Sequence, residues 1–195
     1  TDVPKTHQFY DHIHYLYNEN IITGYENNQF KPDQELTRGH AAVMLARAFD
    51  LDLTPRETVF QDVNKTISGA VQSAYEAGII NGKSTTSFAP NEKITRQQMA
   101  MLLARAFKLE EESAKEFSDV GLHKESYSAI RKIHAFGITE GVNDTQFNPG
   151  GFVTRKHFSA FLARGLNKKL RLTISSCGYD ENSRINPNRQ TLNCL

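Results

Sequence analysis

The chain has 195 residues, 38% of them apolar, which is enough for the core of an ordinary globular domain. Its 23 Lys and Arg residues almost balance its 22 Asp and Glu residues, so the formal net charge is only +1. A protein with so little net charge lacks the long-range field that draws proteins to nucleic acid or anionic lipid. We therefore expect no nucleic-acid partner and, because the sequence has no run of about 18 or more apolar residues, no membrane insertion.

One pattern occurs three times along the chain. Each copy begins near an Asp-Val pair, continues through a segment such as GIINGKSTTSFAP at 78–90, and ends in a Thr-Arg pair followed by an apolar run. The proline of the pattern recurs at intervals of 58 and 59 residues, at Pro32, Pro90 and Pro149. A period of this size predicts repeated supersecondary units, here at about 1–57, 58–115 and 116–170.

The first element of each repeat is predicted to be an amphipathic helix, because in the second copy Ala70, Ala74 and Ala77 recur at helical spacing. The residue after this helix favours the left-handed conformation that ends helices. It is Asn20, Gly78 or Gly137 in the three copies. A polar loop comes next, with one phenylalanine per copy that we expect to be buried: Phe30, Phe88 and Phe147.

The second helix of each repeat is predicted to begin at a threonine whose hydroxyl caps the first turn. These threonines are Thr37, Thr95 and Thr154, and each precedes an arginine: Arg38, Arg96 and Arg155. The helix that follows, for example AAVMLARAF at 41–49, is apolar almost all the way round, so it must be buried by the other repeats. We therefore expect an all-α fold in which three helix-loop-helix repeats form a single domain over 1–170, with a polar tail or linker over 171–195.

This order of motifs resembles that of the S-layer homology family. FQDV at 60–63, FSDV at 117–120, the Gly-Ile-Ile-x-Gly segment, the Phe-x-Pro loop and the Thr-Arg helix all follow the family pattern. The resemblance implies a closed, pseudo-threefold helical bundle with three projecting loop regions. It also implies non-covalent anchoring of a secreted surface protein to the cell wall. The implied partner is a secondary cell wall polysaccharide with ketal-linked pyruvate on a sugar such as N-acetylmannosamine.

Two departures from the family pattern bear on the sites. The glutamate that the family places after Thr-Arg-Ala is replaced by His40, Gln98 and His157, and only Gln98 can complete the reciprocal capping box in the usual way. The chain also contains no tryptophan that could stack on a sugar. Other aromatic residues stand near the first helix in copies one and three only: Phe9, Tyr10 and Tyr127.

The repeated arginine suggests an anion site. The first turn of a helix presents unpaired N–H groups and a positive dipole end, and a guanidinium there matches a carboxylate such as that of a pyruvate ketal. Arg96 is the favoured ligand-binding arginine, because Thr95 and Gln98 order its helix and because Gly82 and Lys83 are expected beside it. The candidate carbohydrate-binding residues are Arg38, Arg96, Arg155, Thr37, Thr95, Thr154, Gly24, Gly82, Lys83, Gly141 and Tyr25.

Two alternatives to sugar binding remain open. The arginines could pair with nearby acids, Asp33, Glu35 and Glu92, and so tie each loop to its helix. The repeats could also form a protein-protein interaction module for surface-layer assembly, with lateral contacts to carboxylates of other surface-layer proteins.

Signatures of enzymes and metal sites are absent from the sequence. It has no H-E-x-x-H, C-x-x-C or G-x-S-x-G motif, so we expect no catalytic residues and no cofactor. His7, His12 and His14 lie close together, but the last two do not share a helix face, so we interpret the three as surface residues rather than metal ligands. Both cysteines, Cys177 and Cys194, fall in the last segment, so the repeats are not expected to depend on a disulfide.

Overall fold

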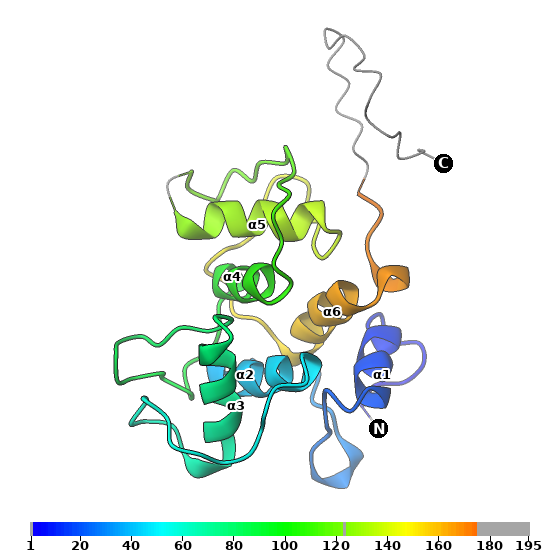
Figure 1. The fold of residues 1–195 in the computed structure, drawn as a ribbon. Helices are drawn as coiled ribbons and strands as arrows, with labels where there is room; N and C mark the ends of the chain where they lie inside the picture. The colour runs from blue at the N-terminus through cyan, green and yellow to red at the C-terminus, as the bar shows by residue number, and fades with distance from the viewer. Residues whose placement is uncertain (1, 123, 175–195) are drawn as a thin grey trace, which may run out of the picture.

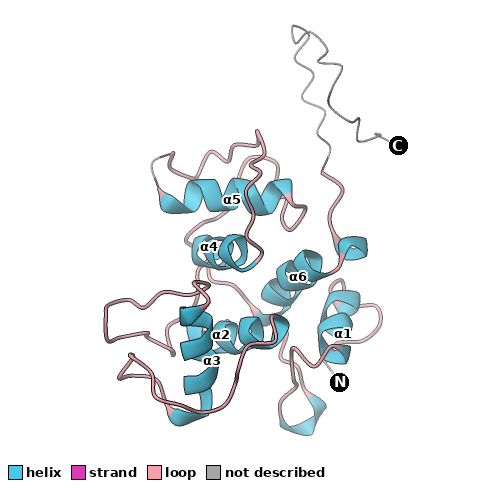
Figure 2. Cartoon of the chain, in the orientation of Figure 1, coloured by secondary structure: helices cyan, strands magenta, loops and turns pink. Residues whose placement is uncertain are grey.

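A computed structural model of the chain describes residues 2–122 and 124–174, and both cysteines lie outside these ranges. The described residues form six α-helices and two short 3-10 helices, and none of them belongs to a strand (Figure 2). The α-helices are α1 (Tyr10–Asn18), α2 (Arg38–Ala48), α3 (Lys65–Glu76), α4 (Arg96–Ala106), α5 (Glu125–Ala135) and α6 (Arg155–Leu166), and the 3-10 helices are η1 (Glu26–Asn28) and η2 (Lys168–Leu170). The prediction of an all-α fold is therefore confirmed.

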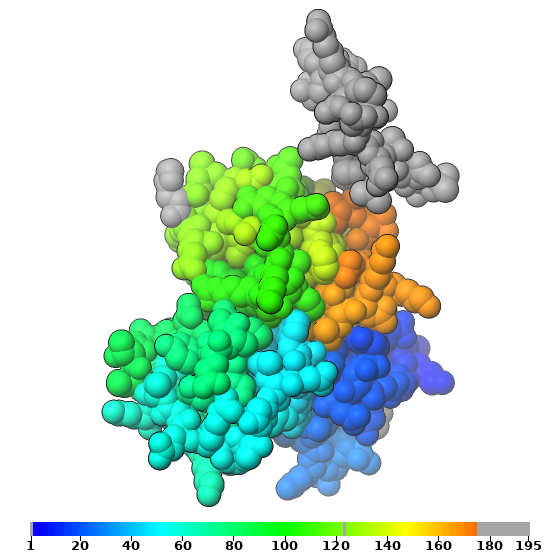
Figure 3. Space-filling view, in the orientation of Figure 1, coloured from blue at the N-terminus to red at the C-terminus, as the bar shows by residue number. Residues whose placement is uncertain are grey.

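Helices pair between repeats. The first helix of the second repeat, α3, packs on α2 of the first repeat, and α5 of the third repeat packs on α4 of the second (Figure 1). The remaining first helix, α1, packs on α6 at the opposite end of the described chain. The space-filling view shows the same closure, with the blue N-terminal atoms beside the orange atoms of the α6 region (Figure 3).

Three backbone hydrogen bonds join the three repeats in a cycle just before the second helices begin. The N–H of Leu36 donates to the carbonyl of Val153 (2.8 Å), that of Val153 to Ile94 (3.0 Å), and that of Ile94 to Leu36 (3.0 Å). All three side chains are fully buried. This cycle supports the pseudo-threefold arrangement that the family resemblance implies.

The core combines the three second helices, the loop phenylalanines and the apolar faces of the first helices. Small side chains such as Ala41, Ala42 and Ala46 of α2 are fully buried, which is how an almost wholly apolar helix is accommodated among its neighbours. The phenylalanines predicted to be buried are so, with exposed fractions of 8% or less: Phe30, Phe88 and Phe147.

The first helices end as predicted, since the residue that follows each of them has a positive φ: Asn20 (58°), Gly78 (70°) and Gly137 (76°). After α6 the chain passes the end of α5, where the N–H of Leu172 donates to the carbonyl of Gly137 (3.0 Å). Arg171 lies over the ring of Phe136 and donates to the carbonyl of Arg164. The packed part of the chain thus extends beyond residue 170.

Because helices pair between repeats, a single repeat should not fold. Residues 1–57 contain α1 and α2, which belong to different helix pairs, so this fragment should show little helix and no cooperative melt. Residues 31–90 have a similar length but contain the packed pair α2 and α3, so they should retain more helix. Far-UV circular dichroism of the two fragments tests this expectation, and a cooperatively melting 1–57 monomer would contradict it.

Candidate functional site

Each Thr-Arg arginine reaches into the loop of the next repeat. Its Nε donates a hydrogen bond to the carbonyl of the loop phenylalanine, and its guanidinium lies over the ring of the same residue, 4.4–4.6 Å from the centroid. The pairs are Arg38 with Phe88 (2.9 Å), Arg96 with Phe147 (2.7 Å) and Arg155 with Phe30 (2.8 Å). The candidate sites therefore lie between repeats, and the third one joins the two ends of the described chain.

The structure corrects the expected grouping of the site residues. Gly82 and Lys83 accompany Arg38 rather than Arg96, since Nη2 of Arg38 donates to the carbonyl of Asn81 (2.8 Å). The sequence-based grouping was wrong because the loop of the second repeat packs on α2. The equivalent contact in the third site joins Nη2 of Arg155 to the carbonyl of Thr23 (3.1 Å), beside Gly24 and Tyr25. By the same relation Arg96 faces the loop that contains Gly141.

The first two N–H groups of each second helix are not free, contrary to the expectation for an anion site at the helix end. The N–H of Arg38 donates to the carbonyl of Glu92 (2.8 Å) and that of Gly39 to Pro90 (2.9 Å), and α4 and α6 show the equivalent bonds. The loop of the next repeat therefore caps each helix. An anionic ligand would have to be bound by the guanidinium groups instead.

No carboxylate of the described residues lies within 4.0 Å of the three arginines. The acids considered as their partners bind lysines instead: Glu92 pairs with Lys83 (2.6 Å), Asp33 with Lys156, and Glu35 with Lys93. The ion-pair alternative is therefore wrong. The arginines do tie loop to helix, but through carbonyl oxygens and aromatic rings, which leave the positive charge without a direct counter-charge.

Burial makes Arg96 the most unusual of the three. Only 7% of Arg96 is exposed, compared with 8% of Arg155, while Arg38 is partly exposed. Burial lowers the pKa of Arg96 to about 10, against an opposing effect of Asp119. Its Nη2 is buried and has no hydrogen-bond partner among the described residues. Arg96 is therefore a cation at neutral pH, and its Nη2 is a hydrogen-bond donor without an acceptor among the described residues.

The aspartate of each Asp-Val pair holds the same loop from the other side, a role that the sequence analysis did not assign. The carboxylate of Asp62 accepts the N–H groups of Phe88 and Ala89, both at 2.8 Å, and Asp2 and Asp119 make the equivalent pairs of bonds. Burial alone would raise the pKa of Asp62, but these bonds hold it below its usual value. The recurrence of this aspartate in all three copies was the available signal.

Two of the candidate glycines are explained by loop packing. A Cβ on Gly82 would lie 2.4 Å from the ring of Phe60, and a Cβ on Gly141, whose φ is +94°, would lie 2.6 Å from the ring of Phe117. A Cβ on Gly24 would meet only the carbonyl of Gln29, at 3.0 Å. Gly82 and Gly141 therefore let the loop pass over a phenylalanine, whether or not a ligand is bound.

This difference gives a paired test of the glycines. Gly82→Ala should lower the free energy of unfolding by about 1–3 kcal/mol, because the added methyl overlaps an aromatic ring. Gly24→Ala should cost less, because only one carbonyl has to move by a few tenths of an ångström. Urea unfolding of both variants measures the difference, and equal losses would contradict the packing explanation.

The threonine caps differ among the three second helices. Thr95 and Gln98 form the complete capping box predicted for α4, and Thr37 accepts the N–H of His40. Thr154 accepts no backbone N–H in α6, and its hydroxyl is instead 2.9 Å from Nδ1 of His157. Burial, with further contributions from Lys156 and Arg96, lowers the pKa of His157 below its usual value.

His157 should make the stability of the domain depend on pH. Because its folded pKa lies below its unfolded value, the unfolded chain binds the proton first, and stability is full above about pH 6.5 and falls as the pH decreases below that value. His157→Gln should reduce the difference in melting temperature between pH 7.5 and 5.5, and Gln98→His should increase it. Calorimetry at the two pH values tests this, and an unchanged difference in both variants would contradict it.

The first repeat also has a pocket of about 430 Å³ beside the Arg155 site. Aromatic side chains from α1 and the loop line it, among them Tyr10, Tyr17 and Tyr25. Tyr25 connects the pocket to the arginine, since the guanidinium of Arg155 lies 4.7 Å from the centre of its ring. Over the same described residues, no cluster of three His, Cys, Asp or Glu suits a metal ion, and no helix has the length and apolar character to cross a membrane.

Comparison with known proteins identifies the family. The model of the S-layer homology domain matches residues 1–42, 59–100 and 116–159. The chain is 34% identical over 163 residues to an endoglucanase from Bacillus sp. (strain KSM-635), with 80% of this chain and 17% of the relative covered. It is 30% identical over 169 residues to an S-layer protein of Bacillus thuringiensis subsp. finitimus and to the S-layer protein sap of Bacillus anthracis, with 84% of this chain and 21% and 20% of those relatives covered.

The three matched segments coincide with the three structural repeats, and each contains the Asp-Val pair, the loop phenylalanine and the Thr-Arg pair of one copy. The chain spans only about a fifth of the length of these relatives. It belongs to the S-layer homology family.

Proposed function

We propose that this chain anchors a larger surface protein to the cell wall by binding an anionic wall polysaccharide at the three arginine sites between repeats. Its family and its S-layer relatives indicate a secreted protein at the cell surface. Relatives whose names denote enzymes, such as the endoglucanase, match this chain over a small part of their length. We infer that the chain is the binding part of such proteins and carries no catalytic residues.

The observation that carries this proposal is that no carboxylate of the described residues contacts the arginines directly. Three guanidinium groups lie at equivalent places, each fixed by a loop carbonyl and an aromatic ring, and none has a carboxylate partner among the described residues. A fixed cation without a counter-charge attracts an anion and loses little side-chain entropy when it binds one.

A ketal-linked pyruvate supplies the matching ligand group, because it places one carboxylate on an otherwise neutral sugar ring. Arginine binds carboxylates with two parallel hydrogen bonds, which favours this group over a neutral sugar. In the first repeat, the exposed Tyr17 of the neighbouring pocket offers an aromatic face for the ring of a neighbouring sugar unit.

Arg96 remains the arginine that we propose for the strongest site. The reason is now its hydrogen bonding and no longer the residues expected beside it from the sequence. Its Nη2 has no partner, whereas Nη2 of Arg38 and of Arg155 already donates to a loop carbonyl. A carboxylate that reached Nη2 of Arg96 after a shift of the groups that cover it would satisfy a donor that is otherwise buried without a hydrogen bond, which is a costly state.

Arg96→Lys should weaken binding of a pyruvylated oligosaccharide about tenfold, or about 1.4 kcal/mol, because lysine keeps the charge but loses the planar pair of donors. Truncation to alanine is a poorer test, since it also removes the hydrogen bond to the carbonyl of Phe147 and should lower the melting temperature. Isothermal titration measures the affinity, and thermal melts report the fold.

Arg131→Lys is the matched control. Arg131 also donates Nε to a loop carbonyl, that of Ser113 (2.6 Å), but lies outside the three sites. The Arg131→Lys variant should lose a similar amount of stability and keep its affinity for the pyruvylated oligosaccharide. The same oligosaccharide without pyruvate should bind the parent chain at least about tenfold more weakly. Equal affinity of Arg96→Lys and the parent would refute the role of Arg96, and equal affinity for both sugars would refute the anionic ligand.

Sedimentation with purified wall sacculi separates anchoring from the protein-interaction alternative. If the polysaccharide is the ligand, the chain should sediment with intact sacculi and remain in solution after the polysaccharide has been stripped. Retention on stripped sacculi would favour a protein or peptidoglycan partner instead.

A further inference from the structure

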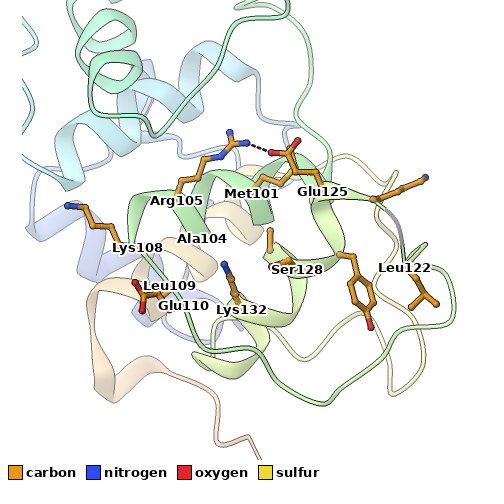
Figure 4. Close-up of a pocket in the computed structure, with 13 residues that line it drawn as sticks. Met101, Ala104, Arg105, Lys108, Leu109, Glu110, Leu122, Glu125, Ser128 and Lys132 are labelled. Atoms are coloured by element: carbon orange, nitrogen blue, oxygen red, sulfur yellow. Dashed lines mark hydrogen bonds and ion pairs between the residues drawn. The ribbon is translucent and has the colours of Figure 1, made fainter.

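A groove of about 680 Å³ lies between α4 and α5 (Figure 4). Apolar side chains such as Met101, Ala104 and Leu109 line part of it. Four basic side chains line the rest, with two acidic ones: Arg105, Lys108, Lys124, Lys132, Glu110 and Glu125. None of these residues is among those assigned to the three arginine sites.

In the α2 and α3 pair, which corresponds to α4 and α5 in the repeat, the equivalent face is covered by the chain itself. The linker after α2 lies directly on α3, where the hydroxyl of Ser73 donates to the carbonyl of Asp52 (2.6 Å). The approach is so close that a Cβ on Gly69 would lie 2.2 Å from the carbonyl oxygen of Thr54. An extended stretch of backbone therefore fills this face of α3, and only a glycine permits it.

In α5, Ser128 occupies the position that corresponds to Gly69, and Lys132 the position that corresponds to Ser73, each 59 residues further on. A side chain at 128 prevents the close approach seen at Gly69, and the linker after α4 takes another path. It is held by Arg131, whose Nε donates to the carbonyl of Ser113 (2.6 Å) and whose carbonyl accepts the N–H of Ser113 (3.2 Å). The linker still touches this face at one point, where the hydroxyl of Ser128 donates to the carboxylate of Glu112, and the rest of the face is left open as the groove.

The open face is basic. Arg105 pairs with Glu125, as the dashed line in Figure 4 marks. Among the described residues, Lys108, Lys124 and Lys132 have no ion-pair partner, and Glu110 is the one remaining acid of the lining. This excess of positive charge attracts an acidic ligand and repels a basic one.

We propose that the groove between α4 and α5 binds an extended acidic peptide segment of a partner protein, which lies along α5 as residues 52–54 lie along α3. The sister pair supports a peptide as the occupant, because backbone of this same chain fills the equivalent face. The charge of the lining supports an acidic one. This interaction surface is independent of wall binding and of the arginine sites.

The probe is the chain's own covering segment, residues 50–55, as the acetylated and amidated peptide Asp-Leu-Asp-Leu-Thr-Pro. Added to the full isotope-labelled chain, it should shift the NMR signals of α4 and α5 around the groove. Binding should weaken as salt is added, because the lysines are solvent-accessible. A control peptide with both aspartates replaced by asparagine should bind at least about fivefold more weakly.

Lys132→Glu should weaken binding of the acidic peptide at least about fivefold. Lys5→Glu makes the same change in net charge at an exposed residue outside the lining and should alter affinity less than about twofold. If Lys132→Glu fails to fold, Lys132→Ser introduces the residue of the sister helix and should still lower the affinity.

The proposal is overturned if the peptide does not bind, if the asparagine peptide binds equally well, or if the two charge reversals have the same effect. Displacement of the peptide by the wall polysaccharide would also overturn it, since the groove would then be a polysaccharide site. Sedimentation with sacculi should be unaffected by Lys132→Glu, which separates this surface from the proposed anchoring function.

Discussion

The rest of the structure depends on the buried cycle of three backbone hydrogen bonds among Leu36, Ile94 and Val153. Each of these residues comes directly before the threonine that precedes a second helix, so the cycle fixes where all three second helices begin. It therefore also fixes where their arginines point. Because every bond in the cycle joins two different repeats, no repeat can satisfy its own backbone there. The loops then complete the arrangement by capping the helix of the preceding repeat.

The binding that we propose and the stability of the fold depend on the same side chains. An arginine that is held by a loop carbonyl and an aromatic ring is already in position before a ligand arrives, which lowers the entropy cost of binding. Because the same contacts hold the loop on the helix, mutations in the site also disturb the fold, so affinity and stability must be measured together. The aspartates of the Asp-Val pairs extend this coupling, because they hold the backbone of the same loops.

Much of the fold was predictable. The cap predicted for Thr154 failed locally, because its hydroxyl lies next to His157, and the other failures have one physical source. The period, the helix ends, the caps and the buried phenylalanines follow from local patterns. The structure confirms the helix ends at Gly78 and Gly137, the burial of Phe88, and the capping box of Thr95 and Gln98. The pairing of helices could not be predicted in this way. A periodic sequence looks the same whether a helix packs within its own copy or against the next one, so Arg96 was grouped with the wrong loop. The role of the first-turn N–H groups was missed for the same reason, since their partners belong to another repeat.

The pairing of α1 with α6 has a consequence for folding kinetics. The other two helix pairs join neighbouring segments and close short loops, whereas this pair has to close a loop of almost the whole described chain, which is the slower step. An intermediate with two pairs formed and the third open leaves apolar faces of α1 and α6 exposed. Two such molecules can exchange these helices and form a domain-swapped dimer, or a longer head-to-tail chain if the exchange continues. A high local concentration of such chains therefore favours exchange between molecules, and rapid ring closure within each molecule opposes it.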